Sequence, residues 1–209
     1  MNKEYVKLIN VTKIIKGKLI LDHINLNISK GKIYGIRGIN GSGKTMLLRA
    51  IAGLMHVKGE VLVDGKKIDG GCFPKSIGVL IETPAFLPEF TAKENMELLS
   101  IIQSGINKSV INETLDMVGL DADDKRKYNK FSLGMKQRLG IAQAIVGCPD
   151  LILLDEPTNA LDKSGITQLI TIIKQLREKG CTLMIASHDE IFLEEVSDHI
   201  YYMEQGKIK

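Results

Sequence analysis

The chain has 209 residues and 44% hydrophobic content, which suits a globular protein with one sizeable core, or one core with a helical insertion, and requires no second domain. Its formal net charge of +3 arises from 28 basic and 25 acidic residues spread along the chain, so charge alone indicates no face for nucleic acid. No uncharged run approaches the ~20 apolar residues that a membrane-spanning helix needs, and the N-terminus lacks the apolar core of a signal peptide.

Residues 1–70 contain mainly strand patterns. Alternating apolar positions and turn residues predict strands over 6–11, 19–28, 33–37 and 60–63. Asp64 and Gly65 are expected to close the last of these strands as a tight turn. This part of the chain therefore predicts a mixed β layer with one helix.

A glycine-rich segment after the third expected strand matches a phosphate-binding loop. It runs Gly38-Ile39-Asn40-Gly41-Ser42-Gly43-Lys44-Thr45, and a helix is expected after it over 45–52. Glycines in such a loop let backbone N–H groups surround a phosphate, and the helix N-terminus adds partial positive charge. Lys44 is expected to reach the β- and γ-phosphates, and Thr45 to offer its hydroxyl to Mg²⁺. The candidate nucleotide-binding residues are Gly38, Asn40, Gly41, Ser42, Gly43, Lys44 and Thr45.

Residues 84–148 have a helical pattern. Thr91 and Glu94 have the spacing of a capping box, in which each side chain accepts a hydrogen bond from the other residue's backbone N–H. A further helix is expected just after Ser132, because an apolar stripe of Leu139, Ala142 and Val146 follows it. The N-terminus of that helix can face a phosphate.

Residues 149–209 return to alternating strands and helices. The apolar run over 151–154 predicts a buried strand, followed by a helix over 163–179 and a strand over 181–187. Continuous apolar strands between helices predict a parallel sheet that is covered on both faces.

Two adjacent carboxylates, Asp155 and Glu156, follow the first strand of this part. Ligands bind at the carboxyl ends of parallel strands, and neighbouring strand residues point in different directions. Asp155 is therefore expected to hold Mg²⁺, through water, and Glu156 to act as the general base on the attacking water.

The three cysteines, Cys72, Cys148 and Cys181, are isolated in the sequence. They lack the paired spacing of a metal or redox site, and their odd number favours a reducing compartment. They are expected to be small apolar fillers.

The order of the motifs resembles the ATP-binding cassette (ABC) family over essentially the whole chain. The matching segments after the phosphate loop are Ser132-Leu133-Gly134-Met135-Lys136-Gln137-Arg138, Leu153-Leu154-Asp155-Glu156-Pro157, Asn159-Ala160-Leu161-Asp162 and His188. The resemblance implies an α/β fold, a P-loop NTPase (RecA-like) core with a parallel sheet, an antiparallel β layer and an inserted helical subdomain. It implies one domain over 1–209, with core and β layer in 1–83 and 149–209 and the helical subdomain in 84–148.

The resemblance also implies a head-to-tail dimer in which the Ser132 segment of one subunit closes over ATP on the other subunit's phosphate loop. Ser132 and Gly134 then bind the partner's ATP, and Asp162 lies in a loop that crosses the interface. His188 would contact the γ-phosphate and join Glu156 as a catalytic residue. A simple helix N-cap at Ser132 is the alternative, although it leaves Gly134 unexplained.

Some positions depart from the family pattern. Leu133 and Met135 stand where glycine and glutamine are usual, so backbone freedom and a polar contact are lost. Glu82 stands where a glutamine usually links the Mg²⁺ site to the helical block, and its carboxylate makes it a third candidate metal ligand beside Thr45 and Asp155. Ile15 takes the place of an aromatic residue that stacks on adenine, which predicts weak base selectivity.

The segment over 131–142, which contains Ser132, and the glutamate at position 82 are similar to the branch of the family associated with bacitracin- and lantibiotic-type peptide resistance exporters. The resemblance implies an ATPase subunit that uses ATP and Mg²⁺ to energise export of a drug or antimicrobial peptide through permease subunits on separate chains. It implies a cytoplasmic homodimer or heterodimer, peripheral on the inner face of the cell membrane, with no nucleic-acid partner.

Other interpretations remain open at this point. The segment over 83–90, with Phe86, Leu87 and Phe90, either docks a short helix of the membrane subunit or simply caps the helical block. A non-transport ABC ATPase that acts on ribosomes or DNA is the alternative function. A phosphate-loop kinase or switch protein is a third class, but it would lack the segment over 132–138.

Overall fold

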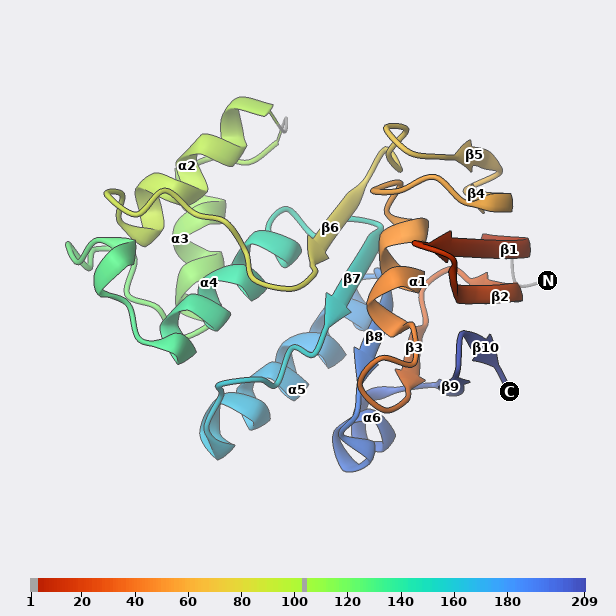
Figure 1. Ribbon diagram of the computed structural model, residues 1–209. Helices are drawn as coiled ribbons and strands as arrows, with labels where there is room; N and C mark the ends of the chain where they lie inside the picture. Colours follow the sequence, from red (N-terminus) through yellow and green to blue (C-terminus); the bar gives the residue numbers. More distant parts are fainter. Residues whose placement is uncertain (1–3, 103–104) are drawn as a thin grey trace.

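The computed structural model describes residues 4–102 and 105–209 and contains two β-sheets with helices around them (Figure 1). The first sheet is four-stranded and antiparallel, with the order β2-β1-β4-β5. Its strands are β1 (Glu4–Ile15), β2 (Lys18–Ser29), β4 (Lys58–Val63) and β5 (Lys66–Ile68). The predicted Asp64-Gly65 turn joins β4 to β5, with φ of 48° and 73° at its two residues.

The second sheet is six-stranded, with the order β10-β9-β3-β8-β7-β6. All of its neighbouring strands are parallel except the β9–β10 pair. The strands are β3 (Ile33–Arg37), β6 (Ile77–Leu80), β7 (Leu151–Asp155), β8 (Thr182–Ser187), β9 (His199–Glu204) and β10 (Lys207–Ile208). β3, β7 and β8 deliver their carboxyl ends to one edge of the sheet, where the phosphate loop and the two carboxylates follow.

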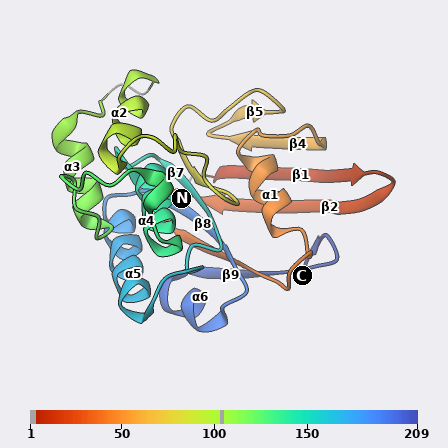
Figure 2. The same cartoon turned by 60° about the vertical axis from the view of Figure 1, so that its left-hand side comes forward.

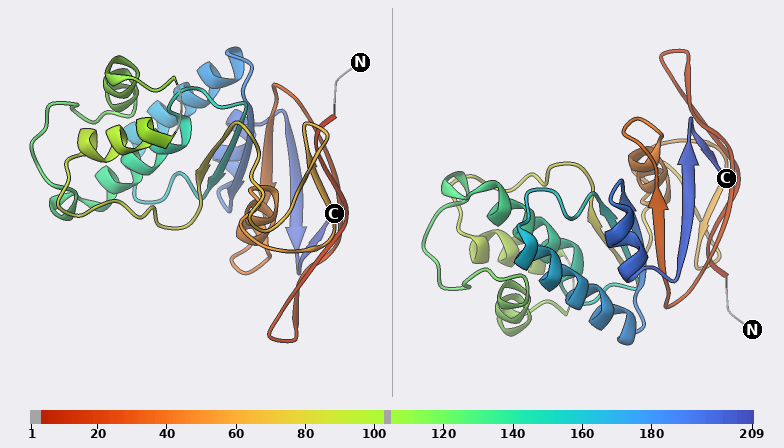
Figure 3. Two further views of the ribbon diagram at one scale, coloured as in Figure 1. Left: turned by 90° about the horizontal axis from the view of Figure 1, so that it is seen from above. Right: turned by 90° about the horizontal axis from the view of Figure 1, so that it is seen from below.

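The described helices lie on both sides of this sheet and at one of its ends. They are α1 (Lys44–Ile51), α2 (Ala92–Ile102), α3 (Lys108–Met117), α4 (Leu133–Ile145), α5 (Lys163–Glu178) and α6 (Glu190–Val196), with a 3₁₀ turn at Tyr128–Lys130. α5 and α6 pack against each other (Figure 2), whereas α2, α3 and α4 gather beyond β6 (Figure 3).

The parallel sheet separates two hydrophobic cores. Ile152 and Leu154 of β7 pack with α4, α5 and α6, whereas Leu151 and Leu153 pack with α1 and the antiparallel sheet. All four side chains are fully buried, because successive residues of a strand point to opposite faces. The continuous apolar run in the sequence therefore reflects burial on both faces, as predicted.

The capping box predicted at the start of the second helix is confirmed. The Thr91 backbone N–H donates to Glu94 Oε2 at 2.6 Å, and the Glu94 backbone N–H donates to Thr91 Oγ1 at 3.2 Å. The strand predicted over 33–37 is observed with the same bounds, as β3. The apolar stripe of Leu139, Ala142 and Val146 is buried, as expected for the inward side of a helix.

Two expectations need correction. β1 and β2 are longer than the predicted strands over 6–11 and 19–28, because a tight turn joins them and extends their pairing to Ile15 and Lys18. The expectation that all three cysteines are buried fillers is wrong for Cys72 and Cys148, which are exposed; only Cys181 is buried.

Candidate functional site

The phosphate loop is held in shape by contacts to the C-terminal strands. Ser42 closes a turn by donating its N–H to the Ile39 carbonyl at 3.1 Å, and its own carbonyl accepts from the Gly206 N–H at 2.9 Å. Gly43, the residue before α1, has φ of 111°, and a Cβ atom there would lie 2.7 Å from the Met203 side chain. Only glycine suits this position, since it combines a left-handed backbone with close packing.

Lys44 is 6% exposed and curls back over the loop that carries it. Its Nζ donates to the Gly38 carbonyl at 2.6 Å and to the Ile39 carbonyl at 3.4 Å. The same atom lies 3.3 Å from Glu156 Oε1. A buried ammonium group at the start of a helix is suited to bind the oxygen atoms of a phosphate group.

Thr45 and Asp155 meet directly, with the Thr45 hydroxyl donating to Asp155 Oδ2 at 2.7 Å. Asp155 is 8% exposed, and its Oδ1 is buried without a hydrogen-bond partner among the described residues. Burial raises the pKa of this carboxyl, and the Thr45 hydrogen bond opposes that rise.

A divalent cation fits these two residues. A buried carboxylate oxygen without a partner, beside a hydroxyl oxygen, offers the hard ligands that Mg²⁺ prefers. Within the described residues there is no group of three or more acidic, histidine or cysteine side chains that could hold a metal. A cation here would therefore need further ligands, such as phosphate oxygens and water.

Glu156 and His188 form the next part of the site. Glu156 Oε2 lies 2.8 Å from His188 Nδ1 and accepts from the Ser187 hydroxyl at 3.2 Å and from the His188 N–H at 3.3 Å. The Glu156 side chain is 16% exposed and that of His188 is 57% exposed. Glu156 thus connects the lysine of the phosphate loop to the histidine that follows β8.

Glu82 is turned towards another partner in this structure. Its Oε2 accepts from Arg49 NH2 at 2.8 Å, and its backbone has φ of 58°. Its charge also raises the pKa of Asp155, but less than burial and the charge of Glu156 do. Its role as a metal ligand stays a prediction.

Ser132, Gly134 and Asp162 lie apart from the phosphate loop, near the first turns of α4 and α5 (Figure 1). Ser132 Oγ accepts from the Met135 N–H at 3.2 Å, and Asp162 Oδ1 accepts from the Gly165 N–H at 3.0 Å. The Ser164 hydroxyl and then the Gly165 N–H lower the pKa of Asp162. Ser132 is thus an N-cap, and its predicted contact to a partner's ATP stays a prediction.

Gly134 has a packing reason within its own chain. A Cβ atom there would lie 3.0 Å from the Ala160 carbonyl oxygen. This contact cannot be predicted from the spacing of residues, because Ala160 belongs to a loop that follows β7 and not to α4.

A hollow of about 300 Å³ contains the phosphate loop and both carboxylates. Lys18 and Ile20 of β2 also line it. These two residues could not be predicted as part of the site, because strand pairing and not sequence spacing brings them to the loop.

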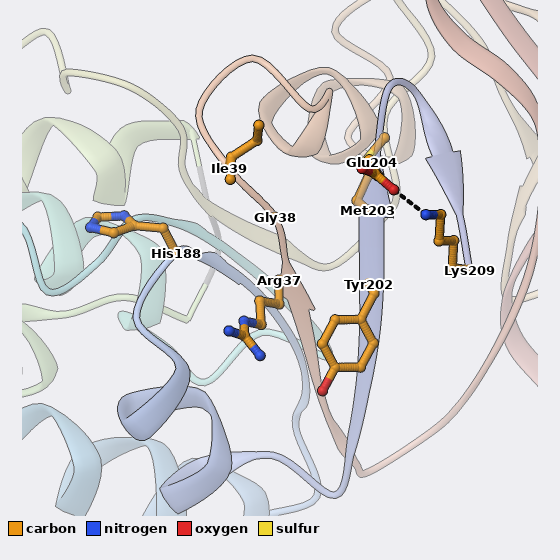
Figure 4. Close-up of a pocket in the computed structure, with 8 residues that line it drawn as sticks. All are labelled: Arg37, Gly38, Ile39, His188, Tyr202, Met203, Glu204 and Lys209. Atoms are coloured by element: carbon orange, nitrogen blue, oxygen red, sulfur yellow. Dashed lines mark hydrogen bonds and ion pairs between the residues drawn. The ribbon is translucent and has the colours of Figure 1, made fainter.

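A larger hollow, of about 470 Å³, lies beside the phosphate loop without either carboxylate (Figure 4). His188 is at one side of it, and the Arg37 guanidinium lies 5.5 Å from the centre of the Tyr202 ring at the other. Glu204 and Lys209 form an ion pair at its far end. Volume alone does not make it the reaction site, since Lys44, Asp155 and Glu156 line the smaller hollow.

Comparison with protein families gives a match to the ABC transporter family over residues 21–159. The uncharacterized ABC transporter ATP-binding protein YybJ of Bacillus subtilis (strain 168) is 41% identical, over 98% of this chain and 94% of that protein. The bacitracin transport ATP-binding protein BcrA of Bacillus licheniformis is 38% identical, over 97% of this chain and 68% of that protein. The lantibiotic transport ATP-binding protein SrtF of Streptococcus pyogenes is 39% identical, over 97% of this chain and 88% of that protein.

The fold is similar to solved cassettes. The dimeric structure of MJ0796, a bacterial ABC transporter cassette, has a TM-score of 0.89 at 30% identity and covers 98% of this chain and 96% of that one. The post-hydrolysis dimer of MJ0796 bound to ADP and Pi has a TM-score of 0.88 at 31% identity, with the same coverage. Across residues 4–102 and 105–209, none of the helices combines the length and apolar character needed to cross a membrane.

Proposed function

This chain belongs to the ABC transporter family of ATP-binding proteins, and we propose that it is the ATP-hydrolysing subunit of an exporter for an antimicrobial peptide or drug. The observation that carries the ATPase part is the contact series Lys44–Glu156–His188 at the phosphate loop. The names of BcrA and SrtF, which refer to bacitracin and lantibiotic transport, support the choice of cargo.

ATP would occupy the hollow that the phosphate loop lines. Lys44 would exchange its bonds to the Gly38 and Ile39 carbonyls for phosphate oxygens, because charge-assisted bonds to phosphate are stronger than bonds to neutral carbonyls. The glycine-rich backbone and the N-terminus of α1 would hold the remaining negative charge. The ion pair between Lys44 and Glu156 would then be broken or lengthened.

Mg²⁺ would be held by Thr45 and Asp155, with Glu82 as a further candidate ligand. When bound, the ion neutralises charge on the β- and γ-phosphate oxygens. Thr45 and Asp155 contribute the hydroxyl and carboxylate oxygens that already face each other. For Glu82 to take part, its carboxylate has to leave Arg49.

Glu156 would accept a proton from the attacking water, and His188 would orient the Glu156 carboxylate and contact the γ-phosphate. Oε2 of Glu156 is already held by Ser187 and His188, so the carboxylate has a fixed direction. A general base placed in this way typically contributes a rate factor of about 10²–10⁴.

The complete site would require a second subunit. Ser132, Gly134 and Asp162 of one subunit would reach the ATP bound to the other, in a head-to-tail dimer that forms with ATP. The N-terminus of α4, with its partial positive charge, suits contact with a phosphate. The dimer, a homodimer or a heterodimer, would bind permease subunits on the inner face of the membrane.

We also propose that residues 1–209 form one ABC ATPase domain, with core and β layer in 1–83 and 149–209 and a helical subdomain in 84–148. Phe86 packs on Tyr128 with ring centres 5.2 Å apart, and the Tyr128 hydroxyl donates to the Pro84 carbonyl at 3.3 Å, so these two residues attach the linking segment to the helical subdomain. Leu87, which is 47% exposed, would then face the permease.

The proposal is tested by affinity purification of the tagged protein from gently solubilised native membranes, followed by mass spectrometry and an ATPase assay of the eluate. A stoichiometric multi-span membrane protein that changes the ATPase rate is the expected result. Ribosomal or DNA-repair proteins, with no membrane protein, would exclude the exporter while leaving the ATPase chemistry in place.

A further inference from the structure

The backbone at Glu156 is in an unusual conformation that neighbouring groups must support. Glu156 has φ of 46°, which non-glycine residues adopt rarely and only where the surroundings stabilise it. Its N–H donates to the Ala186 carbonyl at 2.8 Å, which fixes the end of β7 against β8. Its carbonyl accepts from the Asn159 N–H at 3.1 Å, which closes a turn.

A side chain from α4 supplies the remaining support. Gln137 Nε2 donates to the Pro157 carbonyl at 3.0 Å and to the Glu156 carbonyl at 3.3 Å. Gln137 lies just over one helical turn beyond the Ser132 N-cap, and its side chain is partly buried. One amide group therefore holds two successive carbonyls directly beside the Glu156 side chain.

The same loop is attached to α4 at further points. Gly134 packs against Ala160 so closely that a Cβ atom would lie 3.0 Å from the Ala160 carbonyl. Arg138 NH2 lies 3.8 Å from Asp162 Oδ1, and Arg138 NH1 donates to the Val118 carbonyl and to Gln168 Oε1, both at 2.6 Å. The loop over 156–162 is thus held against the first two turns of α4 at Glu156, Pro157, Ala160 and Asp162.

We propose that Gln137 is a positioning residue for Glu156, through which α4 sets the direction of the Glu156 carboxylate. This inference rests on the proposed function, in which Glu156 is the base and Ser132, on the same helix, serves the partner's ATP. Gln137 does not touch the reacting atoms. It fixes the backbone from which the Glu156 side chain extends, so a small change in the position of α4 reaches the base directly.

The test replaces Gln137 with methionine, which keeps the length of the side chain and removes both donors. We expect kcat for ATP to fall about tenfold, because a displacement of the base by a fraction of an ångström weakens proton abstraction. KM and ATP affinity are expected to change by less than about twofold, because the phosphate loop is not touched. Gln175→Met, on the exposed side of α5, is the matched control and keeps wild-type rates.

The combination with Glu156→Gln separates positioning from general loss of structure. In that background Gln137→Met should add no further loss of hydrolysis, since it acts only through Glu156. A multiplicative further loss, or a Gln137→Met protein that loses ATP binding and thermal stability together with kcat, would show that Gln137 is merely structural.

The result also distinguishes this inference from the proposed function. If Glu156→Gln is nearly inactive while Gln137→Met hydrolyses ATP at the normal rate, the positioning role is overturned and the base assignment stands. If Glu156→Gln itself hydrolyses ATP normally, the base assignment fails, and the role proposed for Gln137 fails with it.

Discussion

Glu156 is the residue on which most of the proposed chemistry depends. Its side chain joins Lys44 to His188, and its backbone is held by β8 on one side and by Gln137 on the other. Replacement by glutamine keeps the shape of the side chain and removes the base. We expect Glu156→Gln to retain ATP affinity within a few fold and to lose about 10²- to 10⁴-fold in kcat.

The measurement is a comparison of ATP binding and single-turnover hydrolysis for the variant and the wild type. Glu195→Gln is a suitable control, because the ion pair of Glu195 with Lys174 is exposed and such pairs contribute little to stability. Normal hydrolysis by Glu156→Gln in a preparation free of other ATPases would remove Glu156 as the base.

The three cysteines differ enough in environment to be distinguished chemically. Burial raises the pKa of Cys181 to about 11, whereas Cys72 and Cys148 are exposed. Because the thiolate is the reactive form, two thiols should react with a disulfide reagent at mildly alkaline pH, and the third only after unfolding. Fast reaction of all three in the folded protein, or of Cys181 as identified by mass spectrometry, would contradict this assignment.

At the scale of single elements, the sequence predicted best those features that are encoded locally. The phosphate loop, the strand that ends at Asp155 and the capping box of Thr91 and Glu94 all depend on residues within a few positions of one another. The contacts of Gln137 with the Glu156 loop depend instead on how α4 packs beside β7. No spacing in the sequence carries that information.

The capping box of α2 should make stability depend on acid pH. The Thr91 backbone N–H, and then the Lys127 side chain, lower the pKa of Glu94 from 4.5 to about 2. Because the folded-state pKa is the lower one, the contribution of the charged carboxylate is complete above pH 4.5 and is lost as the pH falls towards 2.

Thermal unfolding of wild type and Glu94→Gln therefore should differ most near neutral pH, with the wild type more stable. The difference should shrink as the pH is lowered towards about 3. Glu178→Gln at the exposed end of α5 serves as the control. A difference that stays constant with pH would mean that the charge of Glu94 does not support the cap.

The contact between β6 and α4 leaves no room for a side chain at Gly78. A Cβ atom there would lie 1.7 Å from the Ala144 carbonyl oxygen, so Gly78→Ala must move α4 or the strand. We expect a loss of about 3 kcal/mol or more in the free energy of unfolding, measured with urea. Gly180→Ala, where φ is 87° but no atom lies within 4 Å, should cost only about 1 kcal/mol of backbone strain.

At the scale of the whole molecule, the two parts of the predicted ATP site lie on different regions of one subunit. The phosphate loop follows β3, whereas Ser132 begins α4. Two subunits in head-to-tail contact would complete two sites at once. We therefore expect Glu156→Gln, which binds ATP without consuming it, to double its mass in light scattering when ATP is added.

Lys44→Ala should stay monomeric under the same conditions, because it lacks the ammonium group that we propose binds the phosphates. Ser132→Arg places a bulky side chain at the exposed start of α4, and we expect it to bind ATP as a monomer without dimerising. Dimerisation of Ser132→Arg with unchanged affinity would place the interface elsewhere.

The support of the phosphate loop by the C-terminal strands also affects how the protein is made. The loop at residues 38–43 is finished only when the Ser42 carbonyl meets Gly206 and Gly43 packs against Met203, more than a hundred and fifty residues later in the chain. A nascent chain that still lacks the β9–β10 hairpin, which contains Met203 and Gly206, has no complete nucleotide-binding site. Because a ligand stabilises only the state that binds it, ATP would begin to protect the protein only once synthesis has passed this point.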